Sequence, residues 1–238
     1  MSFAPFRFKQ FSMYHHRSTM KIGTDAVLLG IWAEVGGVRR ILEVGTGSGV
    51  ISLLLASRNG NCIIDAVETD NDSCIEAGEN FANSPFSARM NLIKGDFNIF
   101  AAGNRTKYDL IISNPPFFVN DMKPEDPKKR MARHTGTLSY VQLVKGVAGL
   151  LEKSGKFCLV LPYGQRRHFL DICTRYGLFP EREMLIFPKP CKEPNRVNME
   201  LGFEKKEPVS DKFIIRNENG TFTEMYLKTV ENYYISVK

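Results

Sequence analysis

The sequence predicts an α/β protein whose sheet is mostly parallel and doubly wound, with an antiparallel C-terminal edge. Over the first two thirds of the chain, short apolar runs typical of strands alternate with longer segments of helical periodicity. In the last third, strand-like segments follow one another without a helical pattern between them. Alternating strands and helices build parallel sheets with helices on both faces, whereas consecutive strands usually pair antiparallel. We therefore expect a single domain over residues 1–238.

Apolar runs bounded by polar residues or glycine predict the strands, and amphipathic segments between them predict the helices. The expected strands cover residues 40–44, 62–67, 90–93, 108–112 and 156–161. The expected helices cover residues 26–32, 49–58, 72–83, 138–151 and 165–176. The sequence EKSG after residue 151, and Gly177 after residue 176, are typical of helix ends.

The C-terminal third predicts three further strands, at residues 183–187, 197–202 and 213–216. One polar, proline-containing stretch interrupts the pattern at residues 119–135, where the sequence includes DMKPEDPKKRMARH. A loop of this length inside a compact domain is usually functional or disordered.

Composition narrows the class of protein. The 238 residues include 32 Lys and Arg against 26 Asp and Glu, which gives a net charge of +6 and favours polyanionic partners only slightly. The five cysteines form no CxxC pattern and no Cys/His pattern with metal spacing, so we expect reduced thiols and no metal site. No signal peptide and no apolar segment of about 20 residues is visible, which predicts a cytoplasmic protein without a membrane span.

The sequence EVGTGSG, from Glu43 to Gly49, follows the first strand of the alternating pattern and opens a helix. Glycines in this position let the backbone turn sharply and approach a ligand beside a helix N-terminus. Gly45, Gly47 and Gly49 have the spacing GxGxG, which fits the dinucleotide fingerprint GxGxxG less well. A purely structural turn is the alternative interpretation.

Two acidic residues and a proline motif follow later strands. Glu68 ends the next strand, where an acid can accept hydrogen bonds from both hydroxyls of a ribose. Asp96 and Phe97 follow the third strand, where a carboxylate can bind an adenine amino group and an apolar ring can cover the base. Taken alone, each acid is more often a solvated strand-end residue or a helix cap than a ligand. SNPPFF, at residues 113–118, follows the strand at 108–112.

This order of glycine loop, acid, acid and NPPF resembles the class I S-adenosylmethionine-dependent methyltransferases. The resemblance implies a seven-stranded sheet and S-adenosylmethionine as cofactor. NPPF is the version found in enzymes that methylate exocyclic or amide nitrogens. The side-chain carbonyl of Asn114 and the backbone carbonyl of Pro115 would each accept one amine proton, and Phe117 would stack on the base. Fixed φ angles at the two prolines would keep these acceptors still.

A second resemblance extends over nearly the whole chain. The blocks FRFKQFSMYHHRSTMKIGTDAVLLGIWA, RMARHTGTLSYVQLV and KPCKEPNRVNMELG are similar to the bacterial tRNA (adenine-N6)-methyltransferases, which act on adenine 37 beside the anticodon of a valine tRNA. The resemblance implies an anticodon stem-loop as partner, and a monomer is assumed. It also implies that residues 1–38 form an extension that closes over cofactor and RNA. Asp25 would then bind the methionine end of the cofactor, although Thr24 or Asp25 can equally be a helix N-cap.

Basic residues supply the candidate RNA contacts. Lys9 lies in the aromatic and basic run FKQF, and Arg196 lies in a cluster with Lys189 and Lys192. Four more candidates fall in the stretch 119–135, which we interpret as a mobile basic loop: Lys128, Lys129, Arg130 and Arg133. A solvated charge run is the alternative interpretation of this loop, and His134 is expected to be structural or RNA-facing.

Several related activities stay open at this point. Ribosomal-RNA guanine-N2 methyltransferases can also carry NPPF. Glutamine methyltransferases acting on release factors usually carry NPPY and a helical N-terminal domain, and DNA adenine enzymes need extra recognition sequence. A non-catalytic cofactor-binding protein would have no use for Asn114 and Pro115. A nicotinamide oxidoreductase fits neither the glycine spacing nor SNPPF.

Overall fold

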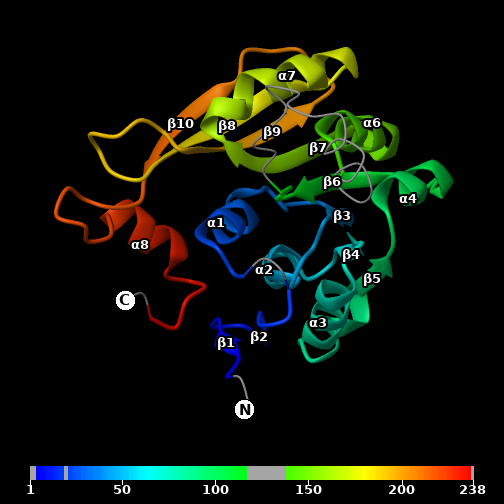
Figure 1. Cartoon of the computed structure of the whole chain (residues 1–238), viewed down its shortest axis with the longest axis horizontal. Helices are drawn as coiled ribbons and strands as arrows, with labels where there is room; N and C mark the ends of the chain where they lie inside the picture. The colour runs from blue at the N-terminus through cyan, green and yellow to red at the C-terminus, as the bar shows by residue number, and fades with distance from the viewer. Residues whose placement is uncertain (1–3, 19–20, 117–137, 237–238) are drawn as a thin grey trace, which may run out of the picture.

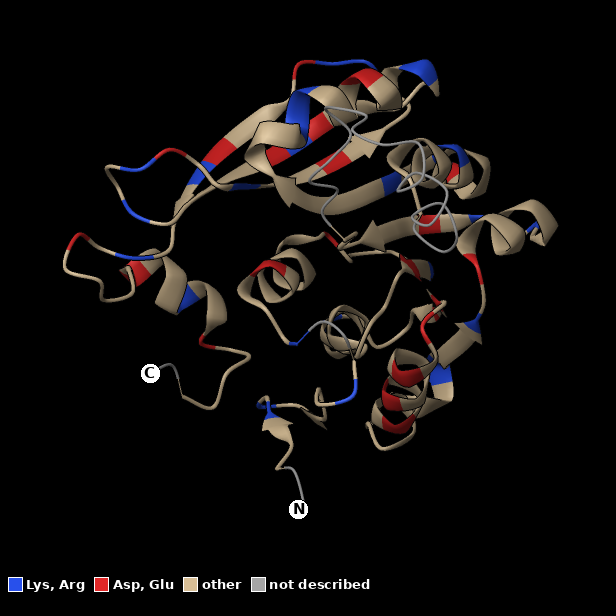
Figure 2. Ribbon diagram, viewed as in Figure 1, with Lys and Arg blue, Asp and Glu red and all other residues tan. Residues whose placement is uncertain are grey.

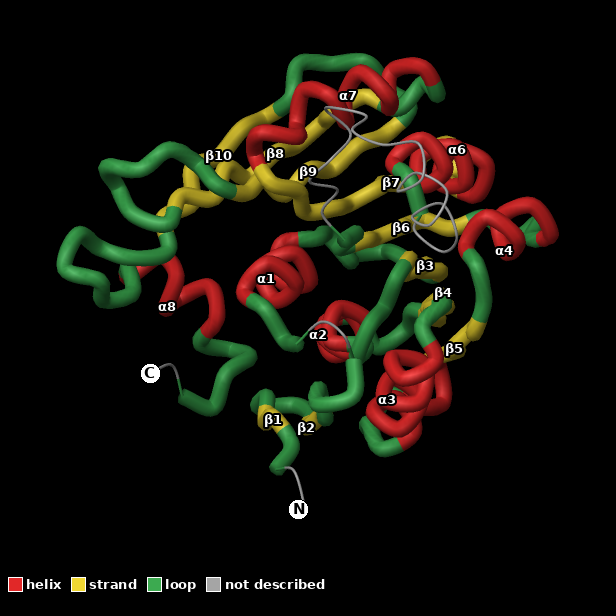
Figure 3. Tube along the Cα trace, in the orientation of Figure 1, coloured by secondary structure: helices red, strands yellow, loops and turns green. Residues whose placement is uncertain are grey.

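The structure is a computed structural model that describes residues 4–18, 21–116 and 138–236. These residues form an eight-stranded sheet in the order β10-β8-β9-β7-β6-β3-β4-β5 (Figures 1 and 3). The strands are β3 (Arg40–Val44), β4 (Ile63–Glu68), β5 (Met90–Lys94), β6 (Tyr108–Ser113), β7 (Leu151–Pro162), β8 (Phe179–Phe187), β9 (Arg196–Gly202) and β10 (Val209–Ile214). The mostly parallel, doubly wound α/β fold is thereby confirmed.

The C-terminal part of the sheet differs from the expectation in two details. The sheet has eight described strands instead of seven, because β10 adds outside β8 and runs parallel to it. The antiparallel strand is β9, which lies between β7 and β8 and pairs antiparallel with both, so it is not at the edge. A short connection from β8 forces β9 to reverse, and β9 then fills the place beside β7.

Helices cover both faces of the sheet (Figure 1). One face packs against α1 (Thr24–Trp32), α2 (Val50–Arg58) and α3 (Asn71–Ala82) through a core that includes Leu54 and Phe81. The other face packs against α4 (Phe97–Gly103), α6 (Tyr140–Leu150) and α7 (Arg166–Arg175). A smaller cluster joins α1 and β8 to α8 (Glu224–Val230). Short 3₁₀ turns at Ser87–Arg89 and Tyr163–Gln165 complete the order.

The two ends of the described chain lie together. A two-stranded hairpin, β1 (Phe6–Arg7) with β2 (Ser12–Met13), precedes α1, and Phe8 forms an antiparallel bridge with Tyr234 (Figure 1). Phe8 stacks on Phe11 at 4.6 Å and on Tyr234 at 5.5 Å between ring centroids. Both phenylalanines are buried, so the aromatic rings of the FKQF run belong to the core. Within the described residues, no helix has the length and apolarity that a membrane crossing requires.

Candidate active site

The carboxyl ends of three adjacent parallel strands meet at one edge of the sheet. Val44 at the end of β3 is opposite Val67 of β4 on one side and Ser113 of β6 on the other. Ser113 also donates from Oγ to the carbonyl of Val44 at 2.8 Å, which ties the two strand ends together. The glycine loop, Glu68 and Asn114 follow directly, so the separate sequence motifs lie side by side.

The glycine loop needs its glycines. Gly45, Gly47 and Gly49 have φ angles of 74°, 57° and 90°, in the left-handed region that favours glycine. At Gly49 a side chain is excluded a second time, because a Cβ there would lie 2.5 Å from the Phe81 ring. The loop is also fastened from below, since the Gly45 N–H donates to the Val67 carbonyl at 2.9 Å. The result is a rigid backbone turn that leads into α2.

Glu43 lies fully buried beneath this loop. Its Oε2 accepts hydrogen bonds from Thr46 Oγ1 at 2.6 Å, from the Ser52 N–H at 3.1 Å and from the Ser52 hydroxyl. Burial raises the pKa of Glu43 to about 7, although the bonds from Ser52 and Thr46 oppose the rise. A carboxyl group that titrates near neutrality therefore lies directly below the glycine turn.

Glu68 closes the loop from the neighbouring strand. Its Oε2 accepts from the Gly47 N–H at 2.8 Å, and its Oε1 accepts from the N–H groups of Thr69 and Asp70, each at 2.8 Å. A carboxylate offers about four acceptor positions, so this side chain can take further hydrogen bonds. Its predicted role with ribose hydroxyls stays a prediction.

Asp96 is the N-cap of α4. Its Oδ1 accepts from the N–H groups of Asn98 at 2.7 Å and Ile99 at 3.2 Å, while Oδ2 accepts no hydrogen bond from any described residue. The cap interpretation is therefore correct, and one carboxylate oxygen remains for a ligand. Phe97 is buried against Gly146 of α6, where an added Cβ would approach its ring to 2.5 Å. Their predicted contacts with adenine stay predictions.

Asn114 and Pro115 follow β6 at the same edge. The Oδ1 atom of Asn114 is buried and has no hydrogen-bond partner among the residues that the structure describes. A buried acceptor left without a donor costs free energy, and this one follows β6 at the edge where the glycine loop lies, which makes it a candidate acceptor for a ligand. Pro115 is buried and Pro116 exposed, whereas Phe117 lies outside the described residues.

Asp25 sits in the first turn of α1 and faces the sheet. Gly23 is the N-cap of this helix, so neither Thr24 nor Asp25 has that role. Instead, Asp25 Oδ2 accepts a hydrogen bond from Arg196 Nε of β9 at 2.7 Å. Both side chains are 28% exposed. A residue predicted to bind cofactor and one predicted to bind RNA are therefore partners.

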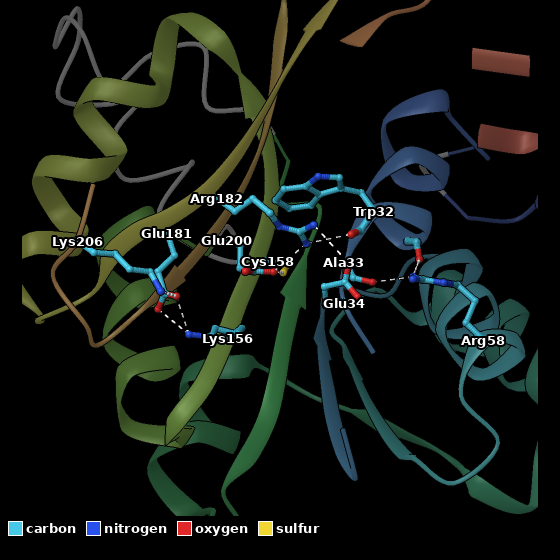
Figure 4. A network of polar contacts seen from close by, with 11 residues as sticks. Trp32, Ala33, Glu34, Arg58, Lys156, Cys158, Glu181, Arg182, Glu200 and Lys206 are labelled. Atoms are coloured by element: carbon cyan, nitrogen blue, oxygen red, sulfur yellow. Dashed lines mark hydrogen bonds and ion pairs between the residues drawn. The ribbon is translucent and has the colours of Figure 1, made fainter. Parts of the chain in front are cut away.

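Arg182 of β8 holds the other end of α1 (Figure 4). Its Nη2 donates to the Trp32 carbonyl at 3.1 Å and to Glu200 Oε2 at 3.0 Å, and its guanidinium lies 4.2 Å from the centroid of the Trp32 ring. Arg58 of α2 donates to the Ala33 carbonyl at 2.7 Å, just beyond the helix end. These contacts fix the C-terminal end of the helix that carries Asp25, whose predicted role with the cofactor stays a prediction.

Comparison with known proteins identifies the chain. A sequence model described as the methyltransferase small domain matches residues 13–170. A protein of Parabacteroides distasonis named tRNA1(Val) (adenine(37)-N6)-methyltransferase is 39% identical over 98% of both chains. A protein of Aeromonas salmonicida with the same name is 38% identical, again over 98% of both chains.

The chain belongs to this methyltransferase family. Solved structures agree on the fold. A predicted O-methyltransferase from Agrobacterium tumefaciens has a TM-score of 0.68 at 16% identity and covers 90% of this chain and 99% of its own. A methyltransferase from Pyrococcus furiosus has a TM-score of 0.56 at 18% identity and covers 80% and 87%. The predicted methyltransferase family and enzyme class are thereby confirmed.

The RNA-binding residues predicted for a member of this family are only partly described. Lys9 is exposed on the N-terminal hairpin, and Arg196 is engaged with Asp25 and with the Asn195 carbonyl at 3.0 Å. The whole stretch 119–135, including His134, lies outside the described residues. Outside them, therefore, are the four candidates of the basic loop: Lys128, Lys129, Arg130 and Arg133. The role of the loop stays a prediction.

Some residues of this methyltransferase site escaped the sequence analysis. Thr46 and Ser52 bind Glu43, and Ser52 gave a usable signal because it is a polar residue inside the apolar run VISLLL of α2. Asn80 and Glu76 of α3 gave none, because a helix with many polar residues on its surface looks solvated. Their contacts with the N-terminal segment become visible only in the folded chain.

Proposed function

We propose that this chain transfers a methyl group from S-adenosylmethionine to N6 of adenine 37 in tRNA1(Val), the reaction named for its relatives. The observation that carries the proposal is the buried Oδ1 of Asn114, which has no hydrogen-bond partner among the described residues and lies beside the glycine loop in a member of this family. An acceptor in this place fits an amine substrate, because each hydrogen of an exocyclic amino group needs an acceptor.

The residues at the strand ends fit the proposed cofactor. The glycine turn leaves room for close approach, since a Cβ added to Gly45 would meet open space among the described residues. Glu68 retains acceptor positions for ribose hydroxyls, and Asp96 Oδ2 is open to an adenine amino group. Asp25 and Glu43 would face the methionine end. When bound, S-adenosylmethionine supplies an electrophilic methyl group on a positively charged sulfur.

Asn114 and Pro115 would orient the nucleophile. The amino nitrogen of adenine is weakly nucleophilic because its lone pair is delocalised into the ring. Two carbonyl oxygens, Asn114 Oδ1 and the backbone oxygen of Pro115, would each accept one proton and favour tetrahedral geometry at nitrogen. Asn114 Oδ1 is buried and Pro115 is a buried residue with a fixed φ, so catalysis would come from positioning and fixed dipoles. Phe117 would stack on the base.

The proposed RNA partner is the anticodon stem-loop. An anticodon loop presents unpaired bases, so extruding the target adenine costs little. Lys9, Arg196 and the basic residues of the 119–135 loop would contact its phosphates. The enzyme is proposed to act as a monomer in the cytoplasm, where tRNA is modified.

The proposal is tested by identifying the product. Unmodified transcripts of several tRNAs, including tRNA1(Val), are incubated with the protein and labelled S-adenosylmethionine, and the RNA is then digested to nucleosides. We expect N6-methyladenosine from tRNA1(Val) and none from a transcript with guanine at position 37. N2-methylguanosine from ribosomal RNA, or label on a protein, would overturn the assignment and support one of the rival acceptors.

A further inference from the structure

Helix α3 holds a segment about 60 residues earlier in the chain through one buried carboxylate. The Glu76 side chain is fully buried, although a carboxyl group is rarely buried without partners. Its Oε1 accepts from the backbone N–H groups of His16 at 2.7 Å and Arg17 at 2.9 Å, and its Oε2 accepts from the Ser18 N–H at 2.8 Å. Three consecutive backbone donors thus converge on a single side chain, which fixes the course of residues 14–18, here named the N-terminal arm.

Asn80, one helical turn further along α3, connects this arm to the glycine loop. Its Oδ1 accepts from the Tyr14 N–H at 2.7 Å. Its Nδ2 donates to the Tyr14 carbonyl and to the Ser48 carbonyl, both at 2.8 Å. Asn80 is 1% exposed, and Ser48 lies between the second and third glycines of the turn. One amide therefore binds the arm and the cofactor loop at the same time.

The far end of the arm reaches the glycine loop directly. Ser18 Oγ lies 3.2 Å from Ser73 Oγ of α3, and a Cβ added to Gly47 would lie 3.5 Å from the same Ser18 oxygen. The arm consequently forms a wall beside the turn, supported by Glu76 and Asn80 of α3, the helix whose ribbon is marked red at several acidic positions in Figure 2.

We propose that Glu76 and Asn80 are positioning residues for cofactor binding, which preorganise the N-terminal arm against the glycine loop without touching the cofactor themselves. This proposal rests on the proposed S-adenosylmethionine site. It follows from the burial of both side chains and from their use of backbone groups on two separate segments. A carboxylate or amide that only stabilised α3 would have no need to satisfy four N–H groups of a distant segment.

The test compares Glu76→Gln and Asn80→Ala with Glu79→Gln. Glu79 is a matched control, because it lies on the same helix and meets the same arm through the Arg17 side chain at 3.0 Å, but in solvent, with 45% of its side chain exposed. In Glu76→Gln an amide NH₂ would face backbone donors, and at least one buried hydrogen bond would be lost. We expect the Kd for S-adenosylmethionine, measured by calorimetry, to rise at least about tenfold in Glu76→Gln and Asn80→Ala. It should stay within about twofold of wild type in Glu79→Gln.

A tether separates positioning from general stability. Ser18→Cys with Ser73→Cys places two thiols where the hydroxyls are 3.2 Å apart, and formation of the disulfide is verified by mass spectrometry before binding is measured. In the Glu76→Gln background, oxidation should restore most of the lost cofactor affinity, and reduction should remove it again. The KM for the cofactor should follow the same pattern while kcat at saturating cofactor stays nearly constant.

Two results would overturn the inference. One is an unchanged Kd for S-adenosylmethionine in both Glu76→Gln and Asn80→Ala, even if the Tm of these variants falls. The other is a raised Kd that the oxidised tether does not restore, which would place the effect in the loop alone. If Glu76→Gln does not fold, Asn80→Ala decides by the same Kd measurement. Because the readout is cofactor binding, a protein that binds cofactor normally but methylates no tRNA would refute the proposed function without touching this inference.

Discussion

Substituting Asn114 with alanine should remove turnover without weakening the fold. The Oδ1 of Asn114 is buried and receives no hydrogen bond from the described residues. In the free protein such an acceptor costs about 1–3 kcal/mol, so removing it should leave the free energy of unfolding unchanged or slightly raised. If the same oxygen accepts an amine proton during transfer, its loss removes one of two fixed acceptors and should lower kcat by about 10²–10³.

The assay combines single-turnover methylation of tRNA1(Val) with calorimetric titration of the cofactor and urea unfolding. We expect Asn114→Ala to bind S-adenosylmethionine with a Kd within about threefold of wild type, because the side chain serves the substrate amine more than the cofactor. Asn198→Ala is the matched control. Asn198 is fully buried in β9, and neither of its amide atoms has a hydrogen-bond partner among the described residues.

Asn198→Ala should therefore give the same neutral effect on unfolding and no loss of turnover. The reasoning about Asn114 fails if Asn114→Ala retains kcat within about threefold. It also fails if Asn114→Ala loses as much stability as a buried residue with satisfied hydrogen bonds would. Equal losses of turnover in Asn114→Ala and Asn198→Ala would show that any change in this region impairs the enzyme.

Three further predictions follow from the site and its partners. Because the pKa of Glu43 is raised to about 7 from 4.5, the folded chain binds this proton more tightly than the unfolded chain, and stability is lost as the pH rises through 7. Between about pH 5 and about pH 8, the unfolding free energy of the wild type without cofactor should fall by on the order of 3 kcal/mol more than that of Glu43→Gln. If the two proteins show the same dependence of unfolding free energy on pH in urea unfolding, the raised pKa is contradicted. Gly49→Ala should cost about 2–4 kcal/mol in urea unfolding, from the left-handed φ and the clash with Phe81, whereas Gly60→Ala, with open space around it, should cost under about 1 kcal/mol. Binding of tRNA should weaken steeply with salt, by a slope of about −0.7 to −0.9 per phosphate contact, while cofactor binding stays nearly constant; equal slopes would argue against an RNA substrate.

The strands of the first two thirds were predictable because their sequence signal and their environment agree. A strand buried on both faces is mostly apolar, and β3 was predicted with its observed bounds, Arg40–Val44. At β10 the signal fails, since residues 209–212 are exposed and only one side of the strand is paired. The predicted strand at 213–216 therefore covers only the end of the observed one, Val209–Ile214.

The sequence signal was wrong for one segment, predicted as a helix end, and too weak for another, a short helix that was not predicted. The sequence EKSG was predicted to end a helix, but these residues lie inside β7, which begins at Leu151. Gly155 is needed there because an added Cβ would lie 2.9 Å from the Tyr108 carbonyl of the neighbouring strand. Conversely, α4 has seven residues and no visible periodicity, so no helix was predicted there, although Asp96 was considered both as a helix cap and as a ligand.

The partners of the site residues could not be predicted, because they come from distant parts of the chain. Glycine loop, acids and NPPF are short motifs whose order along successive strands can be deduced from the sequence. The carboxylate of Glu76, in contrast, meets N–H groups about 60 residues earlier, and no local pattern distinguishes it from the exposed Glu79. Burial alone separates the two glutamates, and burial is a property of the folded chain.

Asp25 was predicted to bind the cofactor and Arg196 to bind RNA, but in the structure the two side chains form an ion pair. The two residues are 171 positions apart, and their side chains meet at 2.7 Å at the start of α1. Because both are partly exposed, the ion pair contributes at most about 1 kcal/mol and can be exchanged for another partner at little cost. A phosphate near Arg196 would displace the Asp25 carboxylate from the guanidinium and leave that carboxylate available to the cofactor. The predicted cofactor role of Asp25 and the predicted RNA role of Arg196 therefore do not exclude each other. Their contact instead means that a substitution at either residue changes the charge at both sites, and only a double-mutant cycle can assign the effect.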